Sequence, residues 1–328
     1  MNFTLLSRFT SSCLCFSLFI LLVTAQHLVR RSVAEPDVTG HSSQQPTTIK
    51  ILVCGDSITQ GQEFDFTWRY RIWEWFRTNA AAHLAPTLQY VGPYNGTLPS
   101  SDRPPPSPVV AGEKYDDDKQ PQSPPLPQSP PLPQPRTWGA YHPTVDPAFV
   151  GTHFALYGRP AWQVVDMLEA QVEEYDPDFV VLHLGFNDLA WWGVPPAELV
   201  ERMAWLVFKA RLGRRGRKKG VVGVLVADVS SRVLLKGRPE LEGLTREYNA
   251  LLAAKVDEWT TAESPVLLVR VSEEYDCHVE SCPAGFDGLH PNALGDYQIA
   301  RAYSKVLHEH YHFGSGPLAV PSINTILP

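Results

Sequence analysis

The sequence is poor in the residue patterns that hold metal ions. It has five cysteines in 328 residues, and it contains neither an HExxH pattern nor paired CxxC spacing. Those patterns place several ligands at the spacing that zinc requires. Their absence argues against a metal site in this protein.

Positive charge is also scarce. Lysine and arginine number 28 against 35 aspartate and glutamate residues, which gives a formal net charge of -7. Binding to phosphate backbones needs a basic surface. We therefore do not expect nucleic acid as a partner.

The apolar run near the N-terminus, residues 13–23, is too short for a comfortable membrane span. It follows a short segment with one positive charge and precedes a small-residue site at Val23 and Ala25. This layout is typical of a secretory signal peptide. We predict a signal over 1–25, a secreted, extracellular protein, and no stable membrane insertion after cleavage. The alternative is an uncleaved anchor.

Two sequence features agree with export. Cys277 and Cys282 lie close enough in DCHVESC to form a disulfide in an oxidising compartment, whereas Cys54 lies in an apolar run and is expected to be a buried thiol. Asn95 begins the sequon Asn-Gly-Thr in a predicted turn, so we predict that it is glycosylated.

The composition divides the chain into unequal parts. Residues 26–47 are polar and predict a disordered leader. One domain is expected over 48–313, followed by a tail over 314–328. Within the domain, 99–137 is a proline-rich insertion, with 13 prolines in 99–135. Such a segment favours polyproline II and cannot join a sheet.

Apolar runs alternate with amphipathic segments through the domain. Five buried strands alternating with helices predict an α/β fold whose parallel sheet is covered on both faces. Ligands of such sheets bind at the carboxyl ends of the strands. The predicted strands are 49–54, 88–92, 178–185, 220–228 and 264–271, and the predicted helices are 66–80, 161–175, 195–213, 239–259 and 292–311.

Polar residues follow the first and third of these strands. CGDSITQG (54–61) lacks the second glycine of a GxSxG elbow, yet it places Ser57 at the carboxyl end of the first strand. GFND (185–188) places Asn187 at the same edge, where a side-chain amide can donate to a developing oxyanion. Each motif also has a structural interpretation, a helix-capping turn for Ser57 and an Asx turn for Asn187.

A third motif, DGLHPN (287–292), follows the last strand. Asp287 and His290 are three residues apart, which lets the carboxylate orient the imidazole while the other ring nitrogen accepts a proton from Ser57. A single DxxH is often structural. Together, the three motifs supply a nucleophile, an oxyanion donor, a base and its orienting carboxylate.

These three motifs resemble, in order and spacing, the blocks of the SGNH (GDSL-type) hydrolases, and the YVG (90–92) and YN (248–249) segments resemble the fungal acetylxylan-esterase-like, carbohydrate esterase branch. The resemblance implies a three-layer α/β/α flavodoxin-like fold with a five-stranded sheet and no cofactor. It also implies Ser57 as nucleophile with Asp287 and His290 completing the triad, and Ser57 and Asn187 as oxyanion donors.

One block departs from the family. The family uses a glycine N–H after its second strand as an oxyanion donor, and the candidate stretch here is YGRPAW (157–162). If this stretch matches the glycine-tryptophan step that is usual in the branch, the donor is Ala161, and Gly158 is the alternative.

The predicted protein is a secreted serine esterase that removes short acyl groups, such as acetyl, from carbohydrate. Its expected substrate is a small-molecule or polysaccharide ester. One alternative is a lipase or phospholipase using the same triad. Another is a non-catalytic carbohydrate-binding protein of the same fold. Three tryptophans predicted near the site, Trp68, Trp191 and Trp192, could stack on sugar rings or line an acyl groove. Core packing is the alternative for Trp68.

Overall fold

The computed structural model describes most of the predicted domain. The predicted signal peptide and leader, and most of the proline-rich insertion, lie outside the described residues. The description covers residues 48–79, 87–102, 138–215 and 222–326.

The centre of the domain is a parallel sheet with strand order β2-β1-β4-β5-β6. A two-residue strand, β3, pairs with the end of β1 outside this order. The five predicted strands are all present, and among the described residues the sheet has this one short strand in addition. The strands are β1 (Thr48–Gly55), β2 (Thr87–Val91), β3 (Phe154–Ala155), β4 (Phe179–His183), β5 (Gly223–Ala227) and β6 (Val266–Val269).

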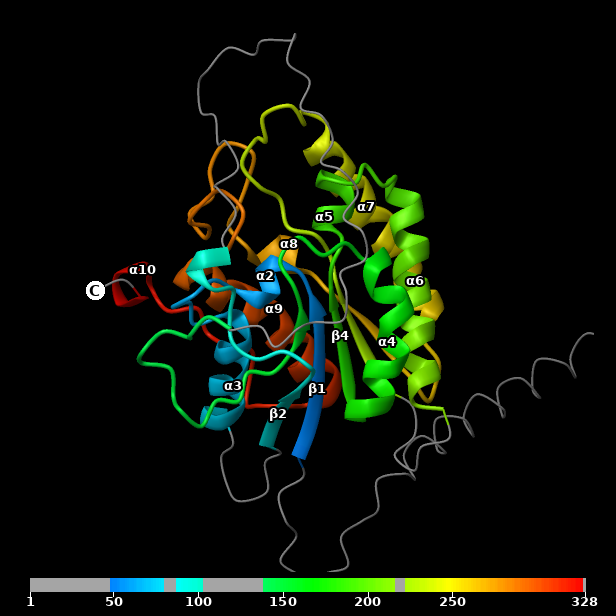
Figure 1. Cartoon of the computed structure of the whole chain (residues 1–328), viewed down its shortest axis with the longest axis horizontal. Coiled ribbons are helices and arrows are strands. Elements are labelled where there is room, and N and C mark those ends of the chain that lie inside the picture. The colour runs from blue at the N-terminus through cyan, green and yellow to red at the C-terminus, as the bar shows by residue number, and fades with distance from the viewer. Residues whose placement is uncertain (1–47, 80–86, 103–137, 216–221, 327–328) are drawn as a thin grey trace, which may run out of the picture. The chain divides into compact units, whose positions relative to one another are not determined.

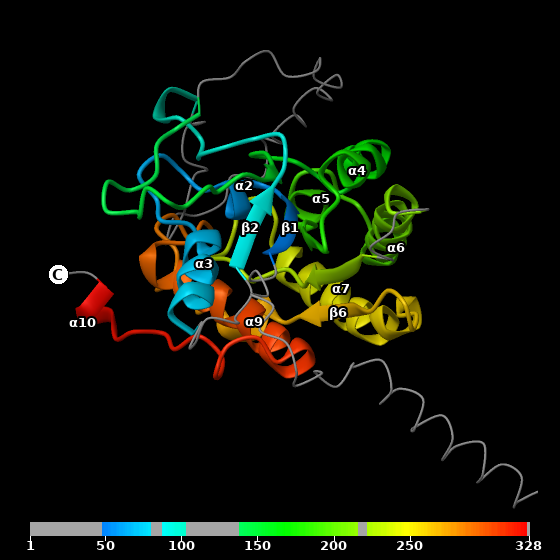
Figure 2. The ribbon, with the colours of Figure 1, turned by 90° about the horizontal axis from the view of Figure 1, so that it is seen from below.

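Helices cover both faces of the sheet. In Figures 1 and 2, α3 and α9 pack together on one face, and α4, α6 and α7 lie on the other. The predicted α/β/α architecture is confirmed. The helices are α2 (Ser57–Gln60), α3 (Trp68–Asn79), α4 (Trp162–Tyr175), α5 (Phe186–Ala190), α6 (Pro196–Gly213), α7 (Leu241–Lys255), α8 (Val271–Glu274), α9 (Ala293–Tyr311) and α10 (Ile323–Ile326), with 3-10 turns η1 (Ser100–Asp102) and η2 (Val256–Trp259).

The strands are apolar because both sides of the sheet are buried. Every residue of β4 and of β5 is buried, as expected for a parallel sheet between two helical layers. Among the helices of the described chain, none is long and apolar enough to cross a membrane.

Local sequence signals set the helix ends. α4 stops at Asp176, which adopts a left-handed conformation (φ 47°) directly before Pro177. α9 begins after Asn292, whose side chain accepts hydrogen bonds from the N–H groups of Leu294 and Gly295. Asn292 therefore caps the helix that follows the predicted Asp-His motif.

A buried arginine joins the loops beneath the site. The side chain of Arg69 is fully buried, its Nε donates to the carbonyl of Thr59 at 3.0 Å, and another guanidinium nitrogen donates to the carbonyl of Gly151. A further nitrogen contacts the Tyr141 hydroxyl at 3.2 Å. Because the buried charge makes several hydrogen bonds, it holds α2 against the connection that precedes β3.

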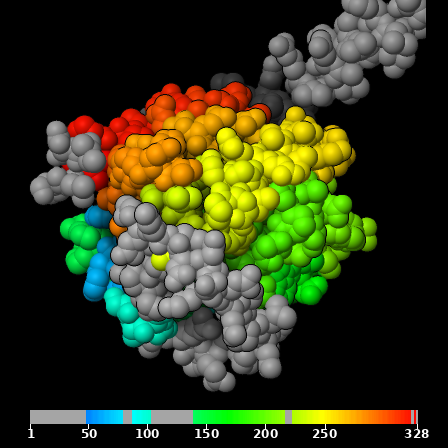
Figure 3. Space-filling model, turned by 90° about the horizontal axis from the view of Figure 1, so that it is seen from above, coloured from blue at the N-terminus to red at the C-terminus, as the bar shows by residue number. Residues whose placement is uncertain are grey.

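The carboxyl ends of the strands meet at one edge of the sheet. β1, which ends at Gly55, pairs with β4. The long helices that come after these strands, α3 after β1 and α6 after β4, lie on opposite faces of the sheet. This is the switch point at which open α/β sheets bind ligands. The view from above in Figure 3 shows this side, where the described segments coloured yellow and orange lie side by side.

Truncating a side chain in the middle strand should destabilise the protein. Leu182 of β4 has no exposed surface, so Leu182→Ala should lower the free energy of unfolding by about 2–5 kcal/mol through lost packing and a cavity. Leu234 is 48% exposed, and Leu234→Ala should change it by about 0.5 kcal/mol or less. Urea denaturation measures both variants, and equal losses would contradict this account of the core.

Candidate active site

Ser57 is the first residue of α2, directly after the turn that leaves β1. Asp56 caps this short helix, and its Oδ1 accepts the N–H of Ile58 at 3.0 Å. Gly55 is needed here because a Cβ would lie 2.3 Å from the Thr59 hydroxyl oxygen. The helix-capping interpretation of the motif and the placement of Ser57 beside a cavity are therefore both correct.

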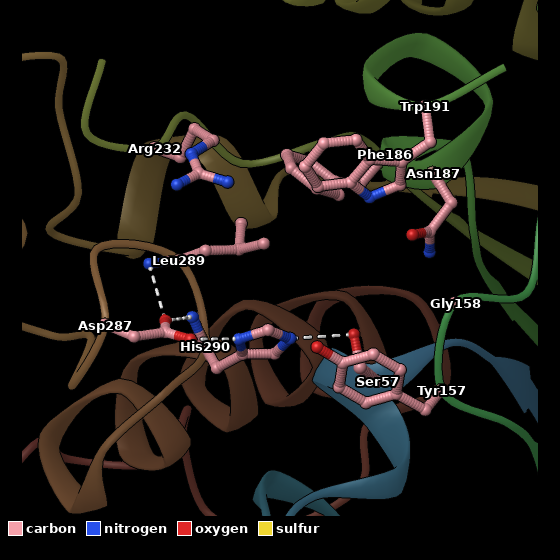
Figure 4. Close-up of a pocket in the computed structure, with 10 residues that line it drawn as sticks. All are labelled: Ser57, Tyr157, Gly158, Phe186, Asn187, Trp191, Arg232, Asp287, Leu289 and His290. Carbon is pink, nitrogen blue, oxygen red and sulfur yellow. Dashed lines mark hydrogen bonds and ion pairs between the residues drawn. The ribbon is translucent and has the colours of Figure 1, made fainter. Parts of the chain in front are cut away.

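His290 joins Ser57 to Asp287 through a continuous chain of hydrogen bonds. Its Nε2 lies 2.9 Å from Ser57 Oγ, and its Nδ1 lies 2.7 Å from Asp287 Oδ2 (Figure 4). Asp287 Oδ1 also accepts the backbone N–H groups of Leu289 at 3.1 Å and His290 at 2.8 Å. The three side chains predicted to form a triad are brought together from opposite ends of the domain.

The environment of Asp287 keeps this carboxyl ionised. Burial by itself raises the pKa of Asp287, but the hydrogen bond and charge of His290, with the backbone N–H groups of Leu289 and His290, outweigh burial and lower the pKa below its usual value. An ionised Asp287 accepts a hydrogen bond from the Nδ1–H of His290. His290 is then held in the tautomer whose Nε2 can accept the proton of Ser57.

Two aromatic rings enclose the imidazole. The Tyr157 ring stacks on His290 with centroids 5.6 Å apart, and the Phe286 ring stacks with centroids 5.9 Å apart. Both aromatic residues are themselves partly exposed, at 38% and 47%. They restrict the rotation of His290 and present ring faces beside the site, and no sequence motif pointed to either of them.

Asn187 reaches the same edge from α5. It lines the cavity beside Ser57, and its Nδ2 donates to Asp56 Oδ2 at 3.0 Å and lies 3.4 Å from the Arg159 carbonyl. Burial raises the pKa of Asp56 to about 7, against the opposing effect of the Ile58 N–H. The buried carboxyl orients the Asn187 amide from behind, so Asp56 has a positioning role that sequence reasoning did not assign.

The preference for Ala161 as a backbone oxyanion donor is wrong. The Ala161 N–H donates to the buried carboxylate of Asp188, whose Oδ2 lies 2.7 Å away. Gly158 instead lines the cavity with a left-handed φ of 70°, a conformation that glycine adopts without strain. The alternative donor, Gly158, is the one whose backbone faces the cavity beside Ser57 (Figure 4).

Asp188 holds this loop from inside the protein. Its side chain is fully buried, accepts the Ala161 N–H, and forms an ion pair with Arg202 at 3.2 Å. Burial raises the pKa of Asp188 to about 6, although the Ala161 hydrogen bond and the Arg202 charge oppose the rise. The motif GFND thus contributes two residues, one that faces the cavity and one that fixes the loop opposite.

The cavity has a volume of about 250 Å³. One wall is polar and carries the Ser57–His290–Asp287 chain, and Phe186, Trp191 and Leu289 form an apolar wall (Figure 4). Its ten lining residues are Ser57, Tyr157, Gly158, Phe186, Asn187, Trp191, Arg232, Asp287, Leu289 and His290.

The three predicted tryptophans separate in the structure. Trp191 lines the cavity and is 42% exposed. Trp192 packs edge-on against Trp162, and Trp68 is buried against Tyr303 with centroids 4.5 Å apart. Trp191 alone of the three is available to a ligand in this cavity.

The cysteines are arranged as predicted. Cys277 and Cys282 form a disulfide in the loop that leads to Asp287, and Cys54 is a free, buried thiol. Asn95 has an exposed side chain, and its glycosylation stays a prediction. Within the described ranges, no group of three or more His, Cys, Asp or Glu residues is placed to hold a metal ion.

Comparison with known proteins identifies the fold. No family model and no curated protein matches the chain. A family 3 carbohydrate esterase from Talaromyces cellulolyticus has a TM-score of 0.53 at 20% identity over 80% of this chain and 97% of its own. A family 3 carbohydrate esterase from Clostridium thermocellum scores 0.51 at 20% identity, over 82% and 100%.

A third similar structure is an acetyl esterase mutant with an acetate ion, with a TM-score of 0.51 at 20% identity over 77% of this chain and 93% of its own. At this level of identity, the likeness establishes the fold. The chain has the α/β/α fold that its resemblance to the SGNH hydrolases predicted.

The buried Asp188 predicts a pH-dependent stability. Its folded pKa is raised above the ordinary value of 3.8, so the folded chain keeps a proton that the unfolded chain has released. The contribution of Asp188 to the free energy of unfolding should therefore be complete below pH 4 and decline until about pH 6. Urea denaturation from pH 4 to 8 should show the wild type losing stability relative to Asp188→Asn over this window.

Arg202→Gln is the matched control for this measurement. Removing the cation that opposes the pKa rise should extend the decline to higher pH. If the wild type instead gained stability relative to Asp188→Asn as the pH rises, the ion pair with Arg202 would outweigh burial.

Proposed function

We propose that this chain is a secreted serine esterase that hydrolyses short acyl esters, such as acetyl esters, of carbohydrates. The observation that carries the proposal is the unbroken Asp287–His290–Ser57 hydrogen-bond chain at the wall of a cavity. The fold shared with carbohydrate esterases supports the same reaction class. Secretion is proposed from the signal-like N-terminus, and a disulfide suits an oxidising compartment.

In the first half of the reaction, Ser57 Oγ attacks the acyl carbon while His290 Nε2 takes the hydroxyl proton. The negative charge that develops on the acyl oxygen is stabilised by the Asn187 amide and by the backbone N–H groups of Ser57 and Gly158. One such donor typically contributes about 3–4 kcal/mol to transition-state stabilisation. Collapse of the tetrahedral intermediate breaks the ester bond, and His290 gives its proton to the departing alcohol.

In the second half, a water molecule replaces the alcohol. His290 accepts a proton from the water as its oxygen attacks the acyl-enzyme carbon. The second tetrahedral intermediate releases the carboxylic acid and returns the proton to Ser57. Asp287 stays ionised throughout, because its role is to orient and stabilise the imidazolium.

Replacing the nucleophile tests the reaction class. Ser57→Ala should abolish hydrolysis of p-nitrophenyl acetate, because it removes the hydroxyl that lies 2.9 Å from His290 Nε2. A fluorophosphonate probe should form a covalent adduct that mass spectrometry maps to Ser57. Ser231→Ala, a nearby serine outside the cavity lining, should keep both properties. Full activity of Ser57→Ala would refute the assignment.

The size of the cavity predicts a preference for short acyl chains. Its volume of about 250 Å³ lies below the usual range for drug-sized ligands, about 300–1,000 Å³. Across p-nitrophenyl acetate, butyrate and octanoate, kcat/KM should fall by about tenfold or more from acetate to octanoate. The apolar wall of Phe186, Trp191 and Leu289 favours the lipase alternative. Octanoate hydrolysed as well as acetate would select that alternative.

A further inference from the structure

Arg232 lines the cavity, but it has no role in the proposed reaction. It lies in the loop that follows β5 and is 7% exposed. Its Nε donates to the carbonyl of Val233 at 3.0 Å, and the guanidinium carbon lies 5.9 Å from the centroid of the Phe186 ring. Two contacts therefore hold the head group in one place at the cavity wall.

The rest of the guanidinium lacks a protein partner. Within the part of the chain that the structure describes, neither terminal amino group of Arg232 has a hydrogen-bond or ion-pair partner, and Asp287 lies beyond ion-pair distance. Burial lowers the pKa of Arg232, which Asp287 and Tyr157 oppose, but an arginine side chain stays protonated in proteins. A buried cation whose donors face a cavity is costly unless an anion completes it.

The position of Arg232 indicates which part of a substrate it meets. Figure 4 shows it on the side of the cavity formed by Asp287 and Leu289, across from Asn187 and Gly158. The acyl oxygen must lie near Asn187 and Gly158, whereas His290 must reach the oxygen of the departing alcohol. Arg232 therefore faces the alcohol half of the ester.

The charge count restricts the group that Arg232 can hold. Among the ten residues that line the cavity, Arg232 is the one with a permanent positive charge, and Asp287 nearby is anionic. One guanidinium balances one negative charge, and its planar fork matches a carboxylate with two parallel hydrogen bonds. A monoanionic carboxylate fits this cavity better than a doubly charged phosphate.

We infer that Arg232 binds a carboxylate on the alcohol half of the substrate, so that the preferred substrates are acyl esters of acidic sugars. This inference rests on the proposed esterase function and adds the substrate class. The exposed rings of Tyr157, Trp191 and Phe286 lie around the same site and can pack against the faces of a sugar ring.

A matched substrate pair tests the inference. Monoacetylated methyl glucuronoside and methyl glucoside, acetylated at the same hydroxyl, differ in one carboxylate. The wild type should show kcat/KM at least about tenfold higher for the glucuronoside ester, chiefly through KM. Arg232→Gln should bring that ratio close to one, and Arg232→Lys should restore part of it, since the charge remains but the fork is lost.

Lys236→Gln is the control for general charge, because Lys236 is an exposed cation a few residues away that does not line the cavity. It should keep the wild-type ratio. The inference is overturned if the wild type does not discriminate, if Arg232→Gln keeps the ratio while lowering both rates, or if Lys236→Gln abolishes the ratio equally.

A binding measurement separates this inference from the proposed function and does not depend on turnover. Calorimetry with Ser57→Ala should detect methyl glucuronoside binding at least about tenfold tighter than methyl glucoside binding. Adding Arg232→Lys should reduce that difference. Absence of the difference overturns the inference about Arg232 even if the esterase is active. A protein that binds glucuronoside selectively but has no hydrolysis and no Ser57 adduct would keep the inference and refute the esterase.

Discussion

The active-site geometry depends on the parallel pairing of β1 with β4. In this register Gly55 lies opposite His183, so the two strands end side by side. Ser57, which follows β1, and Asn187, which follows β4, therefore line the same cavity although they are far apart in the sequence. A shift of one residue in this pairing would reverse the faces of every side chain in β4. The buried apolar side chains of both strands prevent such a shift.

The segment after β6 brings Asp287 and His290 to the site through a capped loop. Asn292 caps α9, the disulfide between Cys277 and Cys282 closes the preceding loop, and Asp287 accepts two backbone N–H groups within the turn. These local bonds hold His290 beside Ser57 and leave its side chain little conformational freedom. The stacked rings of Tyr157 and Phe286 restrict it further. The orientation of His290, the proposed general base, is thus built into the loop.

Buried carboxyl groups support the opposite side of the cavity. Asp56 holds the Asn187 amide and Asp188 holds the N–H of Ala161, so the two acids fix the side of the cavity where the acyl oxygen is proposed to bind. Burial raises the pKa of both, which shows that these positions are maintained against an electrostatic cost. Such support keeps polar donors rigid, and fixed donors stabilise a transition state without reorganising.

The sequence by itself determined the order of strands and helices, since apolar runs of strand length and amphipathic segments are local patterns. It also placed Ser57, Asn187, Asp287 and His290, because strand ends of a parallel sheet share an edge. The tertiary structure decided what depends on distant neighbours. Asp188 occupies the N–H of Ala161 and leaves Gly158 facing the cavity, and loop packing brings Arg232, Tyr157 and Phe286 to the site. Arg232 and Phe286 lie outside every motif, and the motifs that contain Asp188 and Tyr157 did not assign their roles. These roles arise from the direction in which a side chain points, and that direction is set by contacts far apart in the chain.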